Sequence, residues 1–161
     1  MSSRRYKNPI PTVDIVIEQA SKILMIRRRN EPYRGYLALP GGFVNEGERV
    51  EDAARREVNE ETSLDICLMD ILGVYSDPNR DPRGHLMSTV FVGMIAVDKG
   101  ADPVQASAHD DTAEIIWLNL EALENSDIAF DHRKILFDYK VWKVSRGTFW
   151  SSRDTLNSKN V

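Results

Sequence analysis

Cysteine is almost absent from the 161-residue sequence, in which Cys67 is the single example. One cysteine cannot form an intramolecular disulfide, and it supplies too few thiolates for a structural zinc or iron–sulfur site. This cysteine usage favours a reducing compartment. We therefore expect a cytoplasmic protein.

Long apolar runs and an excess of positive charge are missing as well. No stretch approaches the ~18 consecutive apolar residues of a membrane span. The N-terminus, Met1 to Pro11, is polar and basic and does not resemble a secretory signal. Twenty-one Lys and Arg residues against 25 Asp and Glu residues leave a formal charge of −4. The sequence therefore gives no electrostatic reason to expect a membrane or a nucleic acid as partner.

The length and composition are those of one folded domain. Apolar residues make up 42% of the chain and charged residues 29%, which is ordinary globular usage. We expect a single domain over residues 1–161, with a short N-terminal arm over 1–11 and a polar C-terminal tail over about 151–161.

Hydrophobic periodicity and turn residues predict alternating strands and helices. Strands are expected at 12–18, 22–28, 37–39, 67–75, 86–97 and 114–118, and helices at 50–63, 119–126 and 131–144. The run Pro40-Gly41-Gly42 is expected to form a turn, and Asp131 to cap the last helix. This order predicts an α/β fold in which helices cover both faces of a mixed β-sheet.

The first predicted helix carries acidic residues on its apolar side. At ~100° per residue, the apolar residues on that side are Val50, Ala53, Ala54, Val58 and Leu64. Glu57, Glu60 and Glu61, spaced i, i+3 and i+4, share this side, whereas Arg56 falls opposite. We therefore expect three carboxylates to point toward the sheet or toward a cleft over it.

Partly buried carboxylates at this spacing repel one another and require compensation. A divalent cation supplies it, and Mg²⁺ in particular uses a few carboxylates, waters and substrate phosphate oxygens. Glu48, just before the helix, is a further candidate ligand. The alternative is a solvated acidic face on a helix that is rotated or shorter than predicted.

A longer pattern surrounds these glutamates. Gly42 is followed after five residues by Glu48, and after seven more by the run Arg56-Glu57-Val58-Asn59-Glu60-Glu61-Thr62-Ser63-Leu64. This pattern resembles the Nudix box of the Nudix hydrolases at all but one of its fixed positions. Ser63 stands where the family has glycine, and because a left-handed serine costs ~1 kcal/mol, we expect a slightly altered helix exit.

The resemblance implies a Nudix-type α/β/α sandwich with a central mixed β-sheet. It implies Mg²⁺ as the cofactor, with Mn²⁺ as an alternative ion. Arg56 is expected to hold the loop before the helix through a salt bridge to Glu48 or Glu60. The implied metal ligands are Glu57, Glu60, Glu61, Glu48 and the backbone oxygen of Gly41.

The resemblance also implies hydrolysis of a diphosphate bridge by an activated water. Divalent metals lower the pKa of bound water and pair with developing phosphoryl charge, so no nucleophilic side chain is required. The catalytic residues implied are Glu57, Glu61 and Arg56. The candidate general bases are Glu61 and the loop acids Asp110, Asp111 and Glu114.

The loop from Ser76 to His85 contains Arg80 and Arg83, whose planar guanidinium groups suit phosphate or ribose oxygens. Together with the segments 31–35 and 130–133, this loop is similar to the ADP-ribose pyrophosphatase branch of the family. That branch cleaves ADP-ribose to AMP and ribose 5-phosphate, and homodimers are common in it. Arg28 and Tyr33 complete the expected substrate contacts. The candidate walls of an adenine slot are Tyr33, Tyr36 and Phe43.

Two other functions remain open on this reading. One keeps the enzyme but changes the substrate to a nucleoside triphosphate. The other is a non-catalytic regulator that senses ADP-ribose on a Nudix-like domain, and it predicts lost metal-binding glutamates and an added DNA-binding region. Here the box carboxylates are present, and only ~17 residues follow Val144, so we expect an enzyme.

Overall fold

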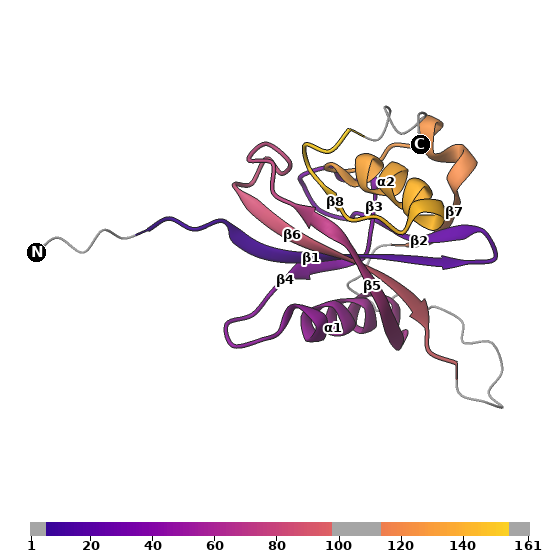
Figure 1. Ribbon diagram of the computed structural model, residues 1–161, viewed down its shortest axis with the longest axis horizontal. Helices are drawn as coiled ribbons and strands as arrows, with labels where there is room; N and C mark the ends of the chain where they lie inside the picture. Colours follow the sequence, from indigo (N-terminus) through magenta and orange to yellow (C-terminus); the bar gives the residue numbers. More distant parts are fainter. Residues whose placement is uncertain (1–5, 98–113, 155–161) are drawn as a thin grey trace, which may run out of the picture.

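The computed structural model describes residues 6–97 and 114–154 (Figure 1). The strands are β1 (Ile10–Gln19), β2 (Lys22–Arg27), β3 (Leu37–Ala38), β4 (Gly41–Phe43), β5 (Ile66–Tyr75), β6 (Leu86–Ile95), β7 (Ile115–Asn119) and β8 (Phe149–Trp150). The helices are α1 (Val50–Thr62), the 3₁₀ helix η1 (Leu120–Asn125) and α2 (His132–Ser145). Within these residues, no helix has both the length and the apolar character needed to cross a membrane.

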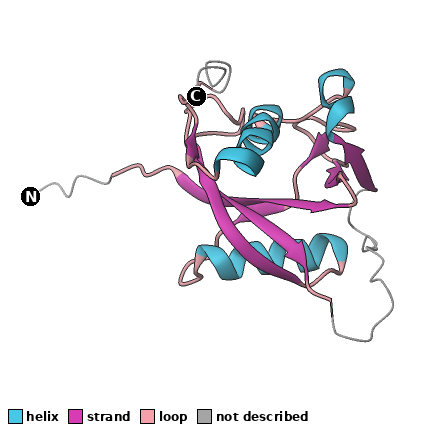
Figure 2. Ribbon diagram, turned by 45° about the vertical axis from the view of Figure 1, so that its right-hand side comes forward, coloured by secondary structure: helices cyan, strands magenta, loops and turns pink. Residues whose placement is uncertain are grey.

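The strands form one mixed sheet with the main order β3-β2-β1-β6-β5-β8, to which β4 adds on β1 and β7 on β2. β1 runs parallel to β6 and antiparallel to β2 and β4. Helix α1 covers one face of the sheet and α2 the other, as both views show (Figures 1 and 2). The predicted α/β/α sandwich with a central mixed sheet is confirmed.

Strand β1 divides the core between the two faces. Successive side chains of a strand point to opposite faces, so Val13, Ile15 and Ile17 pack with Ala53 and other residues of α1. On the other face, Val16 joins the cluster that includes buried residues of α2. Thr12 and Asp14 share the face of Val16 but are polar and buried. They mark the end of the strand that faces a pocket.

Strand β4 replaces the turn expected at Pro40-Gly41-Gly42. Gly41 lies opposite Asp14 and Gly42 opposite Val13 in an antiparallel pairing with β1. A Cβ atom at Gly41 would lie 2.8 Å from Oδ1 of Asp14 and closer still to the backbone oxygen of Val13. Glycine is therefore required here because the two strands approach too closely for a side chain.

Some described residues of the predicted arm and tail belong to the folded body. β1 begins at Ile10, so the N-terminal arm does not extend to residue 11. Residues 151–154 of the predicted tail are tied to the body, because Oγ of Ser151 accepts bonds from the backbone nitrogens of Ser76 and Asp77. The helix expected at 119–126 is the shorter 3₁₀ helix η1.

Helix α1 is capped by Ser63 in the left-handed conformation that glycine, the residue of the Nudix box at this position, adopts readily. Ser63 itself adopts the left-handed conformation, with φ 60°, and its backbone N–H donates to the carbonyl of Asn59. The predicted alteration of the helix exit is therefore wrong, and the cost of the serine is conformational strain.

Ser63→Gly is expected to raise the free energy of unfolding by about 0.5 to 1 kcal/mol, because glycine adopts this conformation without a steric penalty. Urea denaturation followed by circular dichroism measures the change. Ser63→Ala keeps the strained backbone and removes only the hydroxyl group, so it serves as the control. Equal stability of the glycine and alanine variants would contradict the assignment of strain.

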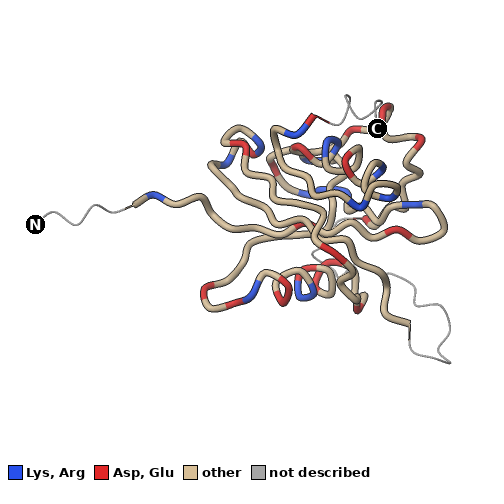
Figure 3. The backbone as a smooth tube through the Cα atoms, in the orientation of Figure 1, with Lys and Arg blue, Asp and Glu red and all other residues tan. Residues whose placement is uncertain are grey.

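Charged positions of both signs are interspersed along the described chain (Figure 3). Helix α1 and the loop before it show this most clearly, since acidic and basic positions alternate along them. The acidic positions of this helix are thus interleaved with basic ones along the chain.

Candidate functional site

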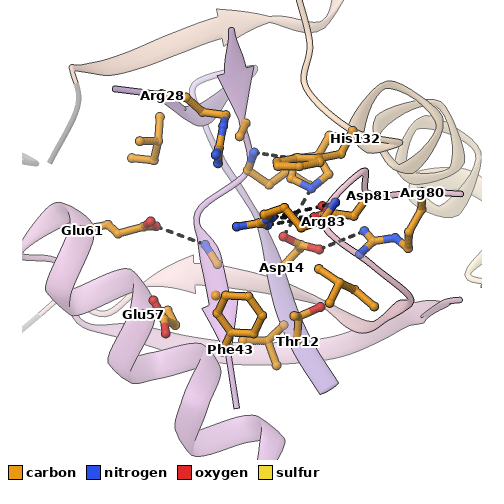
Figure 4. Close-up of a pocket in the computed structure, with 18 of the residues that line it drawn as sticks. Thr12, Asp14, Arg28, Phe43, Glu57, Glu61, Arg80, Asp81, Arg83 and His132 are labelled. Atoms are coloured by element: carbon orange, nitrogen blue, oxygen red, sulfur yellow. Dashed lines mark hydrogen bonds and ion pairs between the residues drawn. The ribbon is translucent and has the colours of Figure 1, made fainter. Parts of the chain in front are cut away.

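A pocket with a volume of about 410 Å³ opens beside β1 and β4 (Figure 4). Helix α1, the loop between β5 and β6, and the start of α2 form its other walls. Charged side chains of both signs line it, with two aromatic rings among them. These residues are Asp14, Glu57, Glu61, Asp81, Arg28, Arg29, Arg80, Arg83, Phe43 and Phe130.

Helix α1 places Glu57 and Glu61 in this pocket. They are four residues apart, so they lie one above the other on the same helix face. Oε2 of Glu61 accepts a hydrogen bond from the backbone N–H of Gly41 at 3.1 Å. A Cβ atom at Gly42 would lie 2.5 Å from both carboxylate oxygens of Glu57. Gly42 therefore leaves room for the Glu57 carboxylate, and the N–H of Gly41 holds that of Glu61.

The environment of Glu61 opposes its negative charge. Burial raises the pKa of Glu61 from 4.5 to about 8, although the bond from Gly41 lowers it. The neighbouring charges of Glu57 and Asp14 raise the pKa further. Burial also raises the pKa of Glu57, against the opposing effect of Arg56. The surroundings of both carboxylates thus disfavour their charged forms.

This raised pKa predicts that the metal-free protein loses stability as the pH rises. Between pH 4.5 and 8 the folded state keeps a proton on Glu61 that the unfolded state has released. The loss from pH 5 to pH 8 is expected to be on the order of 3 to 4 kcal/mol. Thermal denaturation in EDTA measures it.

Glu61→Gln removes the titrating group, so its melting temperature should depend less on pH over the same range. Parallel profiles of the two proteins would contradict the burial of a raised-pKa carboxyl group at this position.

The structure does not bring Glu60 to the pocket. Its side chain is 58% exposed and lies 3.3 Å from Nη1 of Arg56. The helix ends at Thr62, which is fully buried, whereas Leu64 lies beyond the helix end. The predicted apolar side counted Leu64 and left out Thr62. With Thr62 in place of Leu64, the centre of the buried side moves toward Val58, and Glu60 lies outside this side.

Arg56 reaches around the helix instead of pointing away from the glutamates, which corrects the predicted orientation. It forms two bonds to Glu48, at 2.7 and 2.9 Å, and one to Oε1 of Glu57 at 2.7 Å. It also donates to the backbone oxygen of Phe43 at 3.0 Å. The predicted salt bridge to Glu48 or Glu60 is confirmed, since both form. Arg56 therefore ties the end of β4 and the loop to α1, and it orients Glu57.

Arg56→Lys is expected to reduce the turnover of the hydrolysis that the sequence resemblance implies about 10- to 100-fold, because an ammonium group cannot reproduce the planar fork that orients Glu57. Steady-state kinetics measures the change. Arg55→Lys is the matched control, since Arg55 pairs with Asp52 on the exposed side of the same helix. Equal turnover of both variants would show that Arg56 does not orient Glu57 for the reaction.

A buried charged network forms the wall of the pocket that faces α2. Oδ2 of Asp14 accepts bonds from Ser88 at 2.5 Å and from Arg80 at 3.3 Å. Arg80 also donates to both carboxylate oxygens of Asp131, at 2.8 and 2.9 Å. Nε2 of His132 lies 3.3 Å from Oδ1 of Asp14. Although burial opposes it, His132, Arg80 and Ser88 together lower the pKa of Asp14 well below its ordinary range.

This network uses groups for which the sequence suggested other roles. The side chain of Arg80 is 4% exposed and bonded to two carboxylates, so its guanidinium is not free for substrate. Asp131 occupies the N-cap position of α2, but its side chain binds Arg80 and not the helix end. Nδ1 of His132 accepts a bond from the backbone N–H of Leu39, which leaves the Nε2 proton for Asp14.

Arg83 and the aromatic rings lie at the pocket surface. Arg83 forms a bidentate pair with Asp81, with Nη2 to Oδ2 at 2.8 Å and Nε to Oδ1 at 3.0 Å. Its guanidinium carbon lies 5.5 Å from the ring centre of Phe43 and 5.4 Å from that of Phe130. Tyr33 is not among the lining residues, and its ring packs edge-on against Phe130 at 5.0 Å.

Within its described residues, the structure does not place the predicted loop bases in the pocket. Glu114 is exposed and paired with Arg27 at 2.9 Å, and it does not line the pocket. Asp110 and Asp111 lie outside the described residues. Sequence reasoning did not identify Asp14 as a pocket residue, although an aspartate between Val13 and Ile15 in an apolar strand was a usable signal.

The donor set of the pocket fits a divalent cation that shares its coordination with a ligand. In residues 6–97 and 114–154, no cluster of three or more His, Cys, Asp or Glu side chains forms a complete protein-only metal site. Mg²⁺ commonly takes only one or two carboxylates and completes its shell with waters and phosphate oxygens. Glu57 and Glu61 supply two such carboxylates, and a cation between them would relieve their repulsion.

Comparison with known proteins agrees with this geometry. Residues 8–139 match the family model described as NUDIX domain. An ADP-ribose pyrophosphatase of Methanocaldococcus jannaschii is 47% identical over 140 residues, which cover 87% of this chain and 78% of that protein. An ADPR responsive transcriptional repressor, NtrR, of Acinetobacter baylyi is 31% identical over 137 residues, which cover 81% of this chain and 53% of the repressor.

A crystal structure of a MutT/nudix family protein from Enterococcus faecalis has the same fold, with a TM-score of 0.71 and 29% identity. The match covers 88% of this chain and 65% of that one. The chain thus spans about half of the repressor and about two thirds of the solved protein.

Proposed function

Because the chain belongs to the NUDIX family, we propose that it hydrolyses the diphosphate bond of ADP-ribose. Water adds to one phosphorus atom, the bridging P–O bond breaks, and the products are AMP and ribose 5-phosphate. The observation that carries the proposal is the presence of two half-buried carboxylates, Glu57 and Glu61, and several guanidinium groups in one pocket. The 47% identity with an ADP-ribose pyrophosphatase supports the substrate.

The carboxylates of α1 and the groups that hold them have separate tasks in this reaction. Glu57 and Glu61 would hold the divalent cation, Mg²⁺ or Mn²⁺. When bound, this ion lowers the pKa of a water molecule and neutralises phosphoryl oxygens. Arg56 orients Glu57, Gly42 leaves space for the Glu57 carboxylate, and the N–H of Gly41 holds Glu61. The Glu60 side chain would have to leave Arg56 to reach the same ion, so we assign it a minor role.

Glu61 is our candidate for the general base among the described residues. It lies inside the pocket, whereas Glu114 is exposed and bonded to Arg27. With the cation bound, its carboxylate stays charged beside Glu57 and could accept a proton from the attacking water. The Gly41 carbonyl and Glu48 remain metal ligands that only the family resemblance predicts. In the structure, Glu48 is bonded to Arg56.

Product analysis tests the substrate directly. The protein is incubated with Mg²⁺ and ADP-ribose, other nucleoside diphosphate sugars, dinucleotides or nucleoside triphosphates, and the products are separated by anion-exchange chromatography. We expect the highest kcat/KM for ADP-ribose, with AMP and ribose 5-phosphate in equal amounts. Faster release of pyrophosphate from a triphosphate would overturn this substrate assignment. Tight binding of ADP-ribose without turnover would support a regulator, such as the repressor from Acinetobacter.

Assembly and location stay predictions. A homodimer follows from the family resemblance alone, and analytical ultracentrifugation tests it. A cytoplasmic location follows from the single cysteine, Cys67, and cell fractionation tests it.

A further inference from the structure

A connection of two residues, Leu39 and Pro40, joins β3 to β4, and neither residue belongs to a strand. It leads directly to Gly41, whose N–H binds the carboxylate of Glu61 at 3.1 Å. Pro40 has no N–H to donate. The buried N–H of Leu39 donates to Nδ1 of His132 at 3.0 Å. The first residue of α2 thus supplies the hydrogen-bond acceptor for the connection that ends at the Glu61 contact.

The ring of His132 is fixed on two sides. Its side chain is buried, and its ring packs against that of Phe130 with 5.3 Å between the centres. Because Nδ1 accepts the bond from Leu39, the proton of the neutral ring is on Nε2. Nε2 lies 3.3 Å from Oδ1 of Asp14, and Figure 4 shows the ring above this carboxylate. The imidazole therefore bridges β1 and the connection between β3 and β4.

Asp14 and Gly41 lie opposite each other, which closes a ring of contacts. They are partners in the antiparallel pair of β1 and β4, and a Cβ atom at Gly41 would lie 2.8 Å from Oδ1 of Asp14. His132 contacts the chain before Gly41 with one nitrogen and the residue opposite Gly41 with the other. A buried N–H without an acceptor is costly, so the connection would shift if Leu39 lost this bond.

We propose that His132 is a positioning residue for Glu61. It fixes the connection between β3 and β4, and thereby the Gly41 N–H that holds the Glu61 carboxylate. In this role His132 acts through the backbone and contacts neither the substrate nor the cation. The proposal rests on the proposed function for the reaction in which Glu61 takes part. A small movement of Gly41 is sufficient, because a displacement of about 1 Å costs up to about 100-fold in rate.

Two substitutions separate the two bonds of the ring. His132→Asn places an oxygen atom near the position of Nδ1, so it keeps an acceptor for Leu39 and loses the contact with Asp14. His132→Gln places an amide near the position of Nε2, so it keeps a donor for Asp14 and loses the acceptor for Leu39. Both variants remove the ring from the same buried place. A merely structural role therefore predicts similar effects of the two.

Steady-state kinetics with ADP-ribose and Mg²⁺ is the first measurement. We expect His132→Gln to lower kcat about 10- to 100-fold, with KM changed less than about threefold. His132→Asn should recover most of this loss. His85→Gln is the matched control, because His85 is exposed, bonds to the carbonyl of Ser76 and does not line the pocket. It should leave kcat unchanged.

Amide hydrogen exchange of the metal-free protein, followed by nuclear magnetic resonance, is the second measurement and requires no reaction. The amides of Leu39 and Gly41 should exchange at least about tenfold faster in His132→Gln than in the unmodified protein. In His132→Asn they should stay protected. The amides of the paired strands β2 and β7 report global opening and should respond alike in both variants.

Three results would overturn the positioning role. They are an unchanged kcat in His132→Gln, an equal loss of kcat in both variants, and a larger loss in His132→Asn. Rapid exchange of the Leu39 amide in the unmodified protein would overturn it as well, even if a variant fails to fold.

The two proposals fail in different ways. Faster exchange of Gly41 in His132→Gln alone, without hydrolysis of ADP-ribose by the unmodified protein, would support the hold on Gly41 and refute the proposed function. Hydrolysis of ADP-ribose with the same kcat in His132→Gln would leave the function intact and refute the positioning role.

Discussion

Glu61→Gln is expected to reduce the turnover of ADP-ribose on the order of 10³-fold while the fold is retained. The amide keeps the shape of the side chain, so the bond from the Gly41 N–H to an oxygen atom is still available. It removes a negative charge from the pair with Glu57 and the group that we propose as general base. Loss of one preorganised electrostatic contact at a reacting centre costs about 10² to 10³ in rate. Loss of a metal ligand adds to this cost.

Glu60→Gln is the matched control for this variant, because it makes the same chemical change one residue away on the same helix. Its side chain is 58% exposed and outside the pocket, so we expect less than about a tenfold loss. Steady-state assays at saturating Mg²⁺ measure both variants. Turnover of Glu61→Gln within tenfold of the unmodified enzyme, or a larger loss in Glu60→Gln, would contradict the assignment.

Arg80→Met is expected to lower the free energy of unfolding by about 3 to 5 kcal/mol. Arg80 bonds to Asp14 and Asp131, and its own side chain is 4% exposed. Methionine fills a similar volume but leaves two poorly solvated carboxylates without their cation. The cost of removing one partner of a buried ion pair is dominated by the charge that remains. The variant should therefore be destabilised even though the packing is largely preserved.

Urea denaturation followed by fluorescence measures this loss. Arg55→Met is the control, since its pair with Asp52 is about half exposed on α1 and should contribute within about 0.5 kcal/mol. A loss below about 1 kcal/mol in Arg80→Met would show that the network does not hold this wall of the pocket. It would then favour a role for Arg80 in substrate binding, as its sequence context first suggested.

The elements of the fold were largely predictable because their signals are local. Alternating Val13, Ile15 and Ile17 indicated β1, and the absence of glycine and proline over 50–62 indicated α1. Strand β4 was not predictable from Gly41 and Gly42, since its pairing partner is distant in sequence. Local patterns say little about such pairings, which depend on tertiary contacts.

The candidate site was predictable only where helical spacing decides the geometry. Glu57 and Glu61 are one turn apart, so one rotation of the helix places both in the pocket. The error at Glu60 came from a small shift in the centre of the apolar stripe, which the burial of Thr62 reveals. The pairing of Arg80 with Asp14 and Asp131 joins positions 66 and 51 residues apart, and no local pattern indicates it. Arginines that the sequence treated alike thus have different roles.

Binding of Mn²⁺, measured by electron paramagnetic resonance of the free ion, tests the central claim that Glu57 and Glu61 together bind a divalent cation. The ion is titrated into the unmodified protein, Glu60→Gln and the double variant Glu57→Gln/Glu61→Gln, each with and without AMP. We predict that the unmodified protein and Glu60→Gln bind Mn²⁺ similarly, that AMP strengthens binding, and that the double variant binds no ion. Equal binding of Mn²⁺ by the double variant and the unmodified protein would contradict the account.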